Sequence, residues 1–286
     1  MDKVITPRFP EPMIFGKTPR LQSAPGPLTI ANRAGPDTEI DGADLEGLVI
    51  RGASVRGDFH RYDGMPRQDA MLIRRLGESH VLLAVADGLG SRDMSHFGAA
   101  AACRAAFDEL PGSLLNGYET GSASAAAYFT AIAESLADEA TEEGFAAEQV
   151  ATTLTAAVMD LRPRRGARLC QIMRVGDSTA MQLQGGVWTS CFKEDNDQTL
   201  ASSATYALPG DAARVEVNTW ILNPGDMLLF CTDGLAKPMA GQAVREQLAA
   251  WWGGGEPPSL PEFLWQLSFR ARTHDDDRTA ICVWSV

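Results

Sequence analysis

His80-Val-Leu-Leu-Ala-Val-Ala-Asp87-Gly-Leu-Gly-Ser91 is the segment on which the interpretation of this sequence depends. Its near-continuous apolar run, which ends in a glycine-rich turn, is typical of a strand buried on both faces. Asp87 lies where this strand ends. A carboxylate at the mouth of a buried strand is costly unless a partner compensates its charge. The sequence offers no obvious Lys or Arg for this purpose, so Asp87 needs another kind of partner.

A second short apolar segment, 70–76, precedes this strand and is separated from it by a turn-like Gly-Glu-Ser. The two segments are predicted to form a β-hairpin. Glu78 lies midway between Asp69 and Asp87, which places these two aspartates opposite each other at the open end of an antiparallel pair.

The same pattern recurs near the C-terminus. Segment 226–235 is another buried strand that ends in Asp-Gly, with Asp233 in the place of Asp87, and an Asp-Asp-Asp-Arg run leads into a β-rich segment at 279–286. If the strands are antiparallel neighbours in one sheet, four carboxylates converge at its edge: Asp69, Asp87, Asp233 and Asp276. Like charges about 4 Å apart repel by roughly 4 kcal/mol at an effective dielectric constant near 20. Only cations resolve this repulsion, so the sequence predicts a metal centre.

The bulk composition is that of an ordinary globular protein. The chain has 286 residues, of which 45% are hydrophobic and 22% charged, and its formal net charge is −12. Such a chain can bury a large core. The negative charge disfavours nucleic acid or an anionic membrane surface as a partner, because phosphate groups recruit basic surfaces.

Cysteine usage and hydropathy predict a cytoplasmic protein. The five cysteines form no Cys-x-x-Cys pair and are expected to be reduced thiols. The N-terminus lacks the basic region and apolar core of a signal peptide, and no apolar segment approaches the ~20 residues needed to span a bilayer.

The sequence divides into an arm and one domain. Residues 1–46 are rich in Pro and Gly and are predicted to form an extended arm, and residues 47–286 form the domain. The polar segment 190–210 is too long for a simple connection and is a candidate functional flap.

The predicted elements within the domain alternate in blocks. Helices are expected at 95–110, 122–143, 242–252 and 260–273. Strands are expected at 48–55, 70–76, 80–87, 153–161, 169–175, 180–183, around 188, 215–222, 227–231 and 279–286, those from 153 to 188 as a meander. Blocks of strands and helices indicate an α+β fold, in which antiparallel sheets are covered by helix pairs.

Six motifs in sequence carry a family resemblance. They are His60 nine residues before Asp69, Ala86-Asp-Gly-Leu-Gly-Ser91, Ala151-Thr-Thr-Leu154, Val175-Gly-Asp-Ser178, Thr232-Asp-Gly-Leu235 and Asp276-Asp-Arg-Thr279. Over roughly residues 48–286 the chain resembles the metal-dependent protein phosphatases of the 2C type (PPM family), specifically the bacterial branch.

The resemblance implies a four-layer α-β-β-α sandwich and hydrolysis of phosphoserine or phosphothreonine by a water bridged by two Mg²⁺ or Mn²⁺ ions. Asp87 would contact both ions and the Gly88 carbonyl one of them. Asp233 and Asp276 would hold the first ion, and Asp69 the second, largely through water. Asp177 matches a third, weaker metal site, although it could equally be a turn residue. The implied partner is a phosphorylated protein, and a cognate Ser/Thr kinase is a second candidate partner.

Three basic residues near the first motif are candidates for binding the substrate phosphate: His60, Arg61 and Arg67. A forked guanidinium group suits a phosphate anion. The alternatives are a structural hydrogen bond for His60 and a role in surface charge for each arginine.

The sequence matches three other functions less well than that of a metal-dependent phosphatase. A non-catalytic PPM-fold module that binds a phosphoprotein or regulates a kinase is the alternative, and the four core aspartates argue against it. A dinucleotide site at Gly88-Leu-Gly90 lacks a third glycine and a parallel βαβ unit. A haloacid-dehalogenase-like phosphatase needs a second Asp where Leu89 stands.

Overall fold

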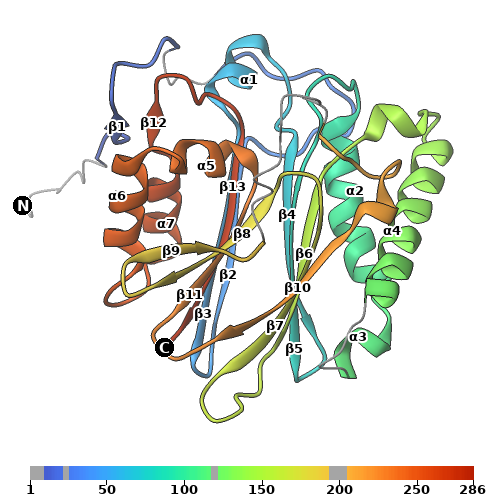
Figure 1. Ribbon diagram of the computed structural model, residues 1–286. Coiled ribbons are helices and arrows are strands. Elements are labelled where there is room, and N and C mark those ends of the chain that lie inside the picture. Colours follow the sequence, from blue (N-terminus) through green and yellow to red (C-terminus); the bar gives the residue numbers. More distant parts are fainter. Residues whose placement is uncertain (1–9, 22–25, 117–121, 193–204) are drawn as a thin grey trace, which may run out of the picture.

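The computed structural model describes residues 10–21, 26–116, 122–192 and 205–286. Two antiparallel sheets form its centre (Figure 1). The five-stranded sheet has the order β10-β7-β6-β5-β4, with β4 (Asp69–Leu76), β5 (His80–Asp87), β6 (Leu154–Asp160), β7 (Arg168–Val175) and β10 (Glu216–Leu222). The six-stranded sheet has the order β2-β3-β13-β11-β8-β9, with β2 (Thr38–Leu45), β3 (Leu48–Val55), β8 (Thr179–Gln184), β9 (Val187–Ser190), β11 (Met227–Cys231) and β13 (Arg278–Ser285).

Helices cover the outer face of each sheet (Figure 1). Helices α2 (Ser95–Asp108) and α4 (Ser122–Glu142) pack on the five-stranded sheet, with the short α3 (Gly112–Asn116) between them in sequence. Helices α5 (Asp233–Met239), α6 (Gln242–Trp252) and α7 (Leu260–Leu267) pack on the six-stranded sheet. Helix α1 (Asp58–Asp63) and the parallel pair β1 (Ile14–Phe15) and β12 (Arg270–Ala271) lie at the top of the view. The predicted four-layer α-β-β-α sandwich is confirmed.

Strand β5 shows why its sequence is apolar on both faces. Leu82, Ala84 and Ala86 pack against the layer of α2 and α4. Val81, Leu83 and Val85 alternate with them and pack against the six-stranded sheet. Because successive side chains of a strand point to opposite faces, a strand between two layers needs apolar residues at every position.

The predicted hairpin is also confirmed, register included. Strands β4 and β5 pair antiparallel, with Asp69 opposite Asp87 and Leu76 opposite His80.

The predicted arrangement of the other strands is wrong in one respect. Strands β6 and β7 pair in one sheet, but β8 and β9 lie in the other, so residues 153–188 do not form a single meander. Strands β5 and β11 likewise belong to different sheets. The predicted aspartates therefore do not meet at the edge of one sheet: they come from two sheets whose strands end on the same side of the sandwich.

Part of the predicted arm contributes to the core architecture. Residues 38–45 form β2, which pairs with β3 along its whole length. The boundary at residue 46 stays a prediction. All five cysteines are buried and unpaired, as expected for reduced thiols. Within the described ranges no helix is both long and apolar enough to cross a membrane.

Candidate metal centre

Asp69 begins β4 and is held in a buried position. Its side chain is only 4% exposed. The Thr232 hydroxyl donates a hydrogen bond to Asp69 Oδ2 at 2.8 Å. Burial raises the pKa of Asp69 well above its usual value, and the nearby charge of Asp277 raises it further. A carboxylate in this position favours protonation or a cation.

Asp87 ends β5, and threonine residues position its backbone. The Asp87 N–H donates to Thr153 Oγ1 at 3.0 Å, and the Asp87 carbonyl accepts from Thr152 Oγ1 at 3.0 Å. The Thr153 N–H donates to the same carbonyl at 2.8 Å. The two threonines of the Ala-Thr-Thr-Leu motif therefore fix the point at which β5 stops.

Other carboxylates surround Asp87. Burial raises the pKa of Asp87 well above its usual value, and the charges of Asp69, Asp233, Asp276 and Asp177 act in the same direction. One carboxylate oxygen from each of Asp87, Asp177 and Asp233 lies within 4.8 Å of the other two. The structure thus brings Asp177, a candidate for the third metal site, beside two of the core aspartates.

Lys237 is a cation that sequence reasoning missed. It forms an ion pair with Asp233 from one turn further along α5. Lys237 follows Asp233 by four residues, a spacing that brings two side chains together only on a helix. No helix was predicted at these residues, so the pair could not be recognised from the sequence. Lys237 compensates one carboxylate, while Asp87 has no hydrogen-bonded cation among the described residues.

Asp276 and Asp277 play different parts. The Asp276 side chain is 59% exposed and lies 3.9 Å from His60 Nδ1. Asp277 is buried and accepts hydrogen bonds from the Gly57 N–H at 2.7 Å, the Gln68 N–H at 2.5 Å and His60 Nδ1 at 2.8 Å. Gln68 directly precedes Asp69, and Asp277 directly follows Asp276. The hydrogen bond from Gln68 to Asp277 therefore fixes the segment of Asp69 relative to that of Asp276.

His60 is buried in helix α1 and is tied to this carboxylate pair. Burial opposes the charged form of His60, but the hydrogen bond and charge of Asp277, with the charge of Asp276, outweigh it and raise the pKa of His60. These contacts match the structural alternative considered for His60, and its contact with phosphate stays a prediction.

The other two phosphate-binding candidates make internal contacts. Arg61 binds Asp37 through two hydrogen bonds of 2.9 and 2.7 Å. Arg67 is buried and donates to the Asp69 carbonyl at 3.1 Å, the Ser54 carbonyl at 3.1 Å and Glu39 Oε2 at 2.8 Å. These contacts do not support a direct role for either arginine in binding phosphate.

Two glycines at the site are required by close packing. A Cβ on Gly88 would lie 2.5 Å from the Ser95 carbonyl oxygen and 2.9 Å from that of Gln68. A Cβ on Gly57 would lie 2.3 Å from the carbonyl carbon of Asp276. Gly88 is not among the glycines with positive φ, so its backbone conformation does not require glycine. The reason is the lack of space for a side chain.

The predicted flap at 190–210 is described only in part, because residues 193–204 lie outside the described ranges. At its end, Thr205 Oγ1 donates to Asp177 Oδ2 at 3.2 Å.

The donor set fits divalent cations. Carboxylate oxygens from β4, β5, the loop after β7, α5 and the loop before β13 gather in one region, and Mg²⁺ and Mn²⁺ prefer such hard oxygen ligands. The raised pKa values of Asp69 and Asp87 describe carboxylates whose charge is not compensated by the protein.

Comparison with protein families gives the class. The model of the protein phosphatase 2C family matches residues 56–266. This chain belongs to the protein phosphatase 2C family.

Solved structures share its fold. PppA, "a key regulatory component of T6SS in Pseudomonas aeruginosa", is 22% identical, with a TM-score of 0.56 over 85% of this chain and 99% of that chain. The Mycobacterium tuberculosis serine/threonine phosphatase PstP is 19% identical, with a TM-score of 0.55 over 82% of this chain and 97% of that chain. The catalytic domain of PstP in complex with two manganese ions is 20% identical, with a TM-score of 0.54 over the same shares, 82% and 97%. Among curated proteins, no match was found. At these identities the likeness establishes the fold.

Proposed function

We propose that the protein is a metal-dependent Ser/Thr protein phosphatase that uses two Mg²⁺ or Mn²⁺ ions to hydrolyse phosphoserine and phosphothreonine. Membership of the phosphatase 2C family supports the reaction class. The observation that carries the proposal is the convergence of the carboxylates of Asp69, Asp177, Asp233 and Asp276 around Asp87.

The proposed ligands have separate tasks. Asp87 would contact both ions, together with the Gly88 carbonyl, while Asp233 and Asp276 would hold one ion and Asp69 the other. Asp177 is the proposed ligand of a third. When bound, such ions supply an activated water and neutralise charge on the phosphoryl oxygens. Thr153, Thr232 and Asp277 orient the ligands through the hydrogen bonds described above.

A cysteine-based mechanism is disfavoured at this site. Cys231 lies two residues before Asp233, but burial raises the pKa of its thiol far above the usual value. A thiol that remains protonated is a poor nucleophile. The hydrolytic route through water is therefore the one that the described residues support.

The proposed substrate is a phosphorylated protein, and a cognate Ser/Thr kinase would supply it. The chemistry alone requires only that some phosphoryl transfer to Ser or Thr precedes this reaction.

Turnover of p-nitrophenyl phosphate with and without Mn²⁺ tests the proposal. We expect Mn²⁺-stimulated hydrolysis and, in Asp87→Asn, a loss of at least about 100-fold in kcat, because one carboxylate shared by two ions is lost. Asp108→Asn, an exposed carboxylate at the end of α2, is the matched control and keeps wild-type turnover. A wild-type protein without Mn²⁺-stimulated turnover, indistinguishable from Asp87→Asn, would support the non-catalytic binding module instead.

A further inference from the structure

A cavity of about 540 Å³ lies beside the candidate metal centre. The N-terminal arm forms one wall, through Pro19, Leu21 and Pro27 among others, and the loop before β13 forms another, through Asp275 and Asp276. Its volume is typical of pockets that bind small molecules or a few residues of a peptide. Asp276 lines the cavity and is also a proposed metal ligand, so the two sites adjoin.

The wall of this cavity carries more positive than negative charge. Six arginines line it, Arg20, Arg56, Arg61, Arg270, Arg272 and Arg278, together with four aspartates, Asp37, Asp58, Asp275 and Asp276. Asp276 is assigned to the metal centre, which leaves three aspartates as partners for six guanidinium groups.

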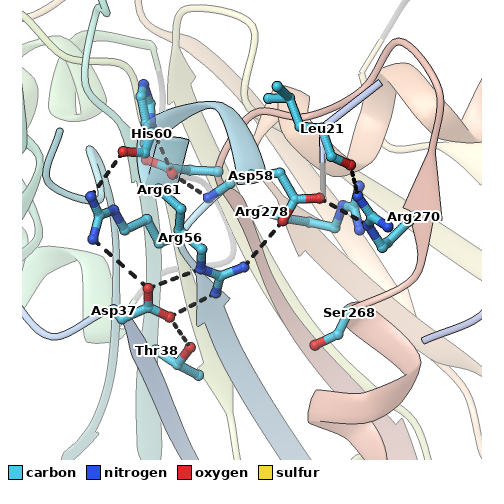
Figure 2. A network of polar contacts seen from close by, with 12 residues as sticks. Leu21, Asp37, Thr38, Arg56, Asp58, His60, Arg61, Ser268, Arg270 and Arg278 are labelled. Atoms are coloured by element: carbon cyan, nitrogen blue, oxygen red, sulfur yellow. Dashed lines mark hydrogen bonds and ion pairs between the residues drawn. The ribbon is translucent and has the colours of Figure 1, made fainter. Parts of the chain in front are cut away.

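Those three aspartates are already paired, and Figure 2 shows the pairs of Asp37 and Asp58. Asp37 binds Arg61, and Asp58 binds Arg270 through Nε at 2.9 Å. Asp275 lies 3.8 Å from Arg20. Within the described residues Arg56, Arg272 and Arg278 therefore have no aspartate of their own in the cavity wall.

These three surplus arginines, Arg56, Arg272 and Arg278, differ in their burial and hydrogen bonds. Arg278 is buried and donates to backbone carbonyls, among them those of Gly234 at 3.0 Å and Leu267 at 2.8 Å. Arg272 is exposed and makes no ion pair within the described residues. It can therefore turn towards an incoming anion at little cost.

Arg56 is the buried member whose charge is least satisfied. It is 7% exposed, and Nη2 donates to the His60 carbonyl at 2.8 Å. Its Nη1 lies 3.9 Å from an Asp37 oxygen that Arg61 also binds, and its buried Nε has no hydrogen-bond partner. Buried donors in native proteins are nearly always paired, so the described residues satisfy the Arg56 guanidinium incompletely.

We propose that this cavity binds the part of the phosphoprotein substrate next to the phosphorylated residue, and that it selects an acidic side chain there. The proposal rests on the phosphatase function proposed above. An extended peptide advances about 3.3 to 3.6 Å per residue. Because Asp276 lines the cavity, a substrate whose phosphate lies at the metal centre can extend residues a few positions away into it, where a carboxylate would match the surplus charge of Arg56 and Arg272.

Paired phosphopeptides test this selection. Each pair differs only in Asp or Asn at one position, two or three residues before or after the phosphothreonine. We expect kcat/KM about five- to tenfold higher for the Asp peptide at one of these positions, expressed mainly in KM, as a charge-assisted contact predicts. Arg272→Gln and Arg56→Gln should each reduce this ratio at least about threefold. Arg104→Gln, an exposed arginine of α2 paired with Glu139, is the matched control and keeps the wild-type ratio.

Arg272→Gln keeps the test decisive if the buried Arg56→Gln variant does not fold. Equal kcat/KM for Asp and Asn peptides at every position, or a preference that both variants retain, would overturn the proposal. Competition by free succinate against both peptides equally would assign the cavity to a small dicarboxylate and would also overturn it.

Binding without turnover separates this proposal from the phosphatase function. Anisotropy of labelled peptides that carry a non-hydrolysable phosphonate in place of the phosphate measures affinity with Mn²⁺ present and without turnover. Tighter binding of the Asp peptide, reduced in Arg272→Gln, in a protein that shows no hydrolysis would support the cavity while contradicting the enzymatic role. Equal affinities in a protein that does hydrolyse phosphopeptides would contradict the cavity alone.

Discussion

At the scale of single residues, Asp277 is not a proposed metal ligand but holds together the segments that carry the ligands. Its two oxygens accept three hydrogen bonds from separate segments. An Asn at this position would turn one acceptor into a donor and set it against an N–H or against His60. The geometry of Asp69 and Asp276 depends on those bonds.

We therefore expect Asp277→Asn to weaken Mn²⁺ binding about 10- to 100-fold, as the loss of an orienting partner does. It should also cost about 1 to 3 kcal/mol of stability, because buried donors lose their acceptor. Titration calorimetry and thermal unfolding measure the two effects. Asp226→Asn is the matched control: Asp226 is similarly buried and accepts from Gln182 and Gln184 at the opposite end of β11, so stability should fall without a change in Mn²⁺ affinity. Unchanged Mn²⁺ binding in Asp277→Asn would show that the segments are held by other contacts.

The raised pKa values of Asp69 and Asp87 predict how stability without metal varies with pH. Burial, with the charges of neighbouring carboxylates, favours their protonated forms in the folded state. A carboxylate whose pKa is raised on folding stabilises the fold fully below its unfolded pKa, and this contribution is lost as the pH rises through the folded value.

In EDTA, wild-type protein should therefore lose stability relative to Asp87→Asn as the pH rises from about 5 to about 8. The difference between the two proteins removes the contributions of the titrating groups that do not interact with Asp87. Urea unfolding at several pH values measures it. A difference in unfolding free energy that does not vary with pH would mean that Asp87 is not destabilised by burial.

Residues of the site divide into those that sequence could reveal and those that it could not. Asp69 directly precedes an apolar run, and Asp87 and Asp233 each follow one, which is a local pattern. The roles of Asp277 and Lys237 depend on which segments meet in space, and no local pattern carries that information. Arg61 and Arg67 were candidates because of their residue type, but their contacts are with Asp37 and Glu39, both in the N-terminal part of the chain.

At the scale of elements, local pairing was predictable and the assignment of strands to sheets was not. The β4–β5 register follows from a short turn, whereas β7 and β8 are joined by an equally short one and yet enter different sheets. Hydrophobic alternation looks the same in either sheet. Helix α5 was missed because seven residues that include Gly234 and Pro238 give a weak helical signal.

The contact between the start of α1 and the loop before β13 allows an element-scale test. Gly57→Ala should displace the Asp275–Asp276 loop, because its Cβ would lie 2.3 Å from Asp276 C and 2.4 Å from Asp275 O. We expect Mn²⁺ affinity to fall at least about tenfold with the circular dichroism spectrum unchanged. Gly254→Ala is the control, since a Cβ there meets no atom within 4 Å. Wild-type Mn²⁺ affinity in Gly57→Ala would mean that the loop yields without moving Asp276.

At the scale of the whole molecule, the N-terminal arm has two structural roles. The described residues 10–21 and 26–36 precede β2, and the first of these segments contacts the region of α7 and β12: Trp265 Nε1 donates to the Pro10 carbonyl at 3.2 Å, and Arg270 N donates to the Met13 carbonyl at 2.7 Å. Residues 38–45 instead form an edge strand of a central sheet. The proline-rich composition predicted an extended arm but gave no sign of this strand.

Two truncations should separate these roles. Deletion of residues 1–36 keeps β2 and Asp37 and should change the melting temperature little. Deletion of residues 1–46 removes β2 and exposes the edge of β3, so the melting temperature should fall by at least about 5 °C and the protein should aggregate at high concentration. Scanning calorimetry and light scattering measure both. Identical behaviour of the two truncated proteins would show that β2 adds nothing to the sheet.

The division of the carboxylates between two sheets has a further consequence. Asp69 and Asp87 lie on strands of one sheet, while Asp233 and Asp276 adjoin strands of the other. Divalent ions held by both pairs would fasten together two halves that otherwise meet through apolar side chains. A slip of one half past the other by a single residue, about 3.3 Å, would pull the pairs out of reach of a shared ion. Metal binding would therefore require the two sheets to be aligned correctly, and a chain with misaligned sheets would have no catalytic activity.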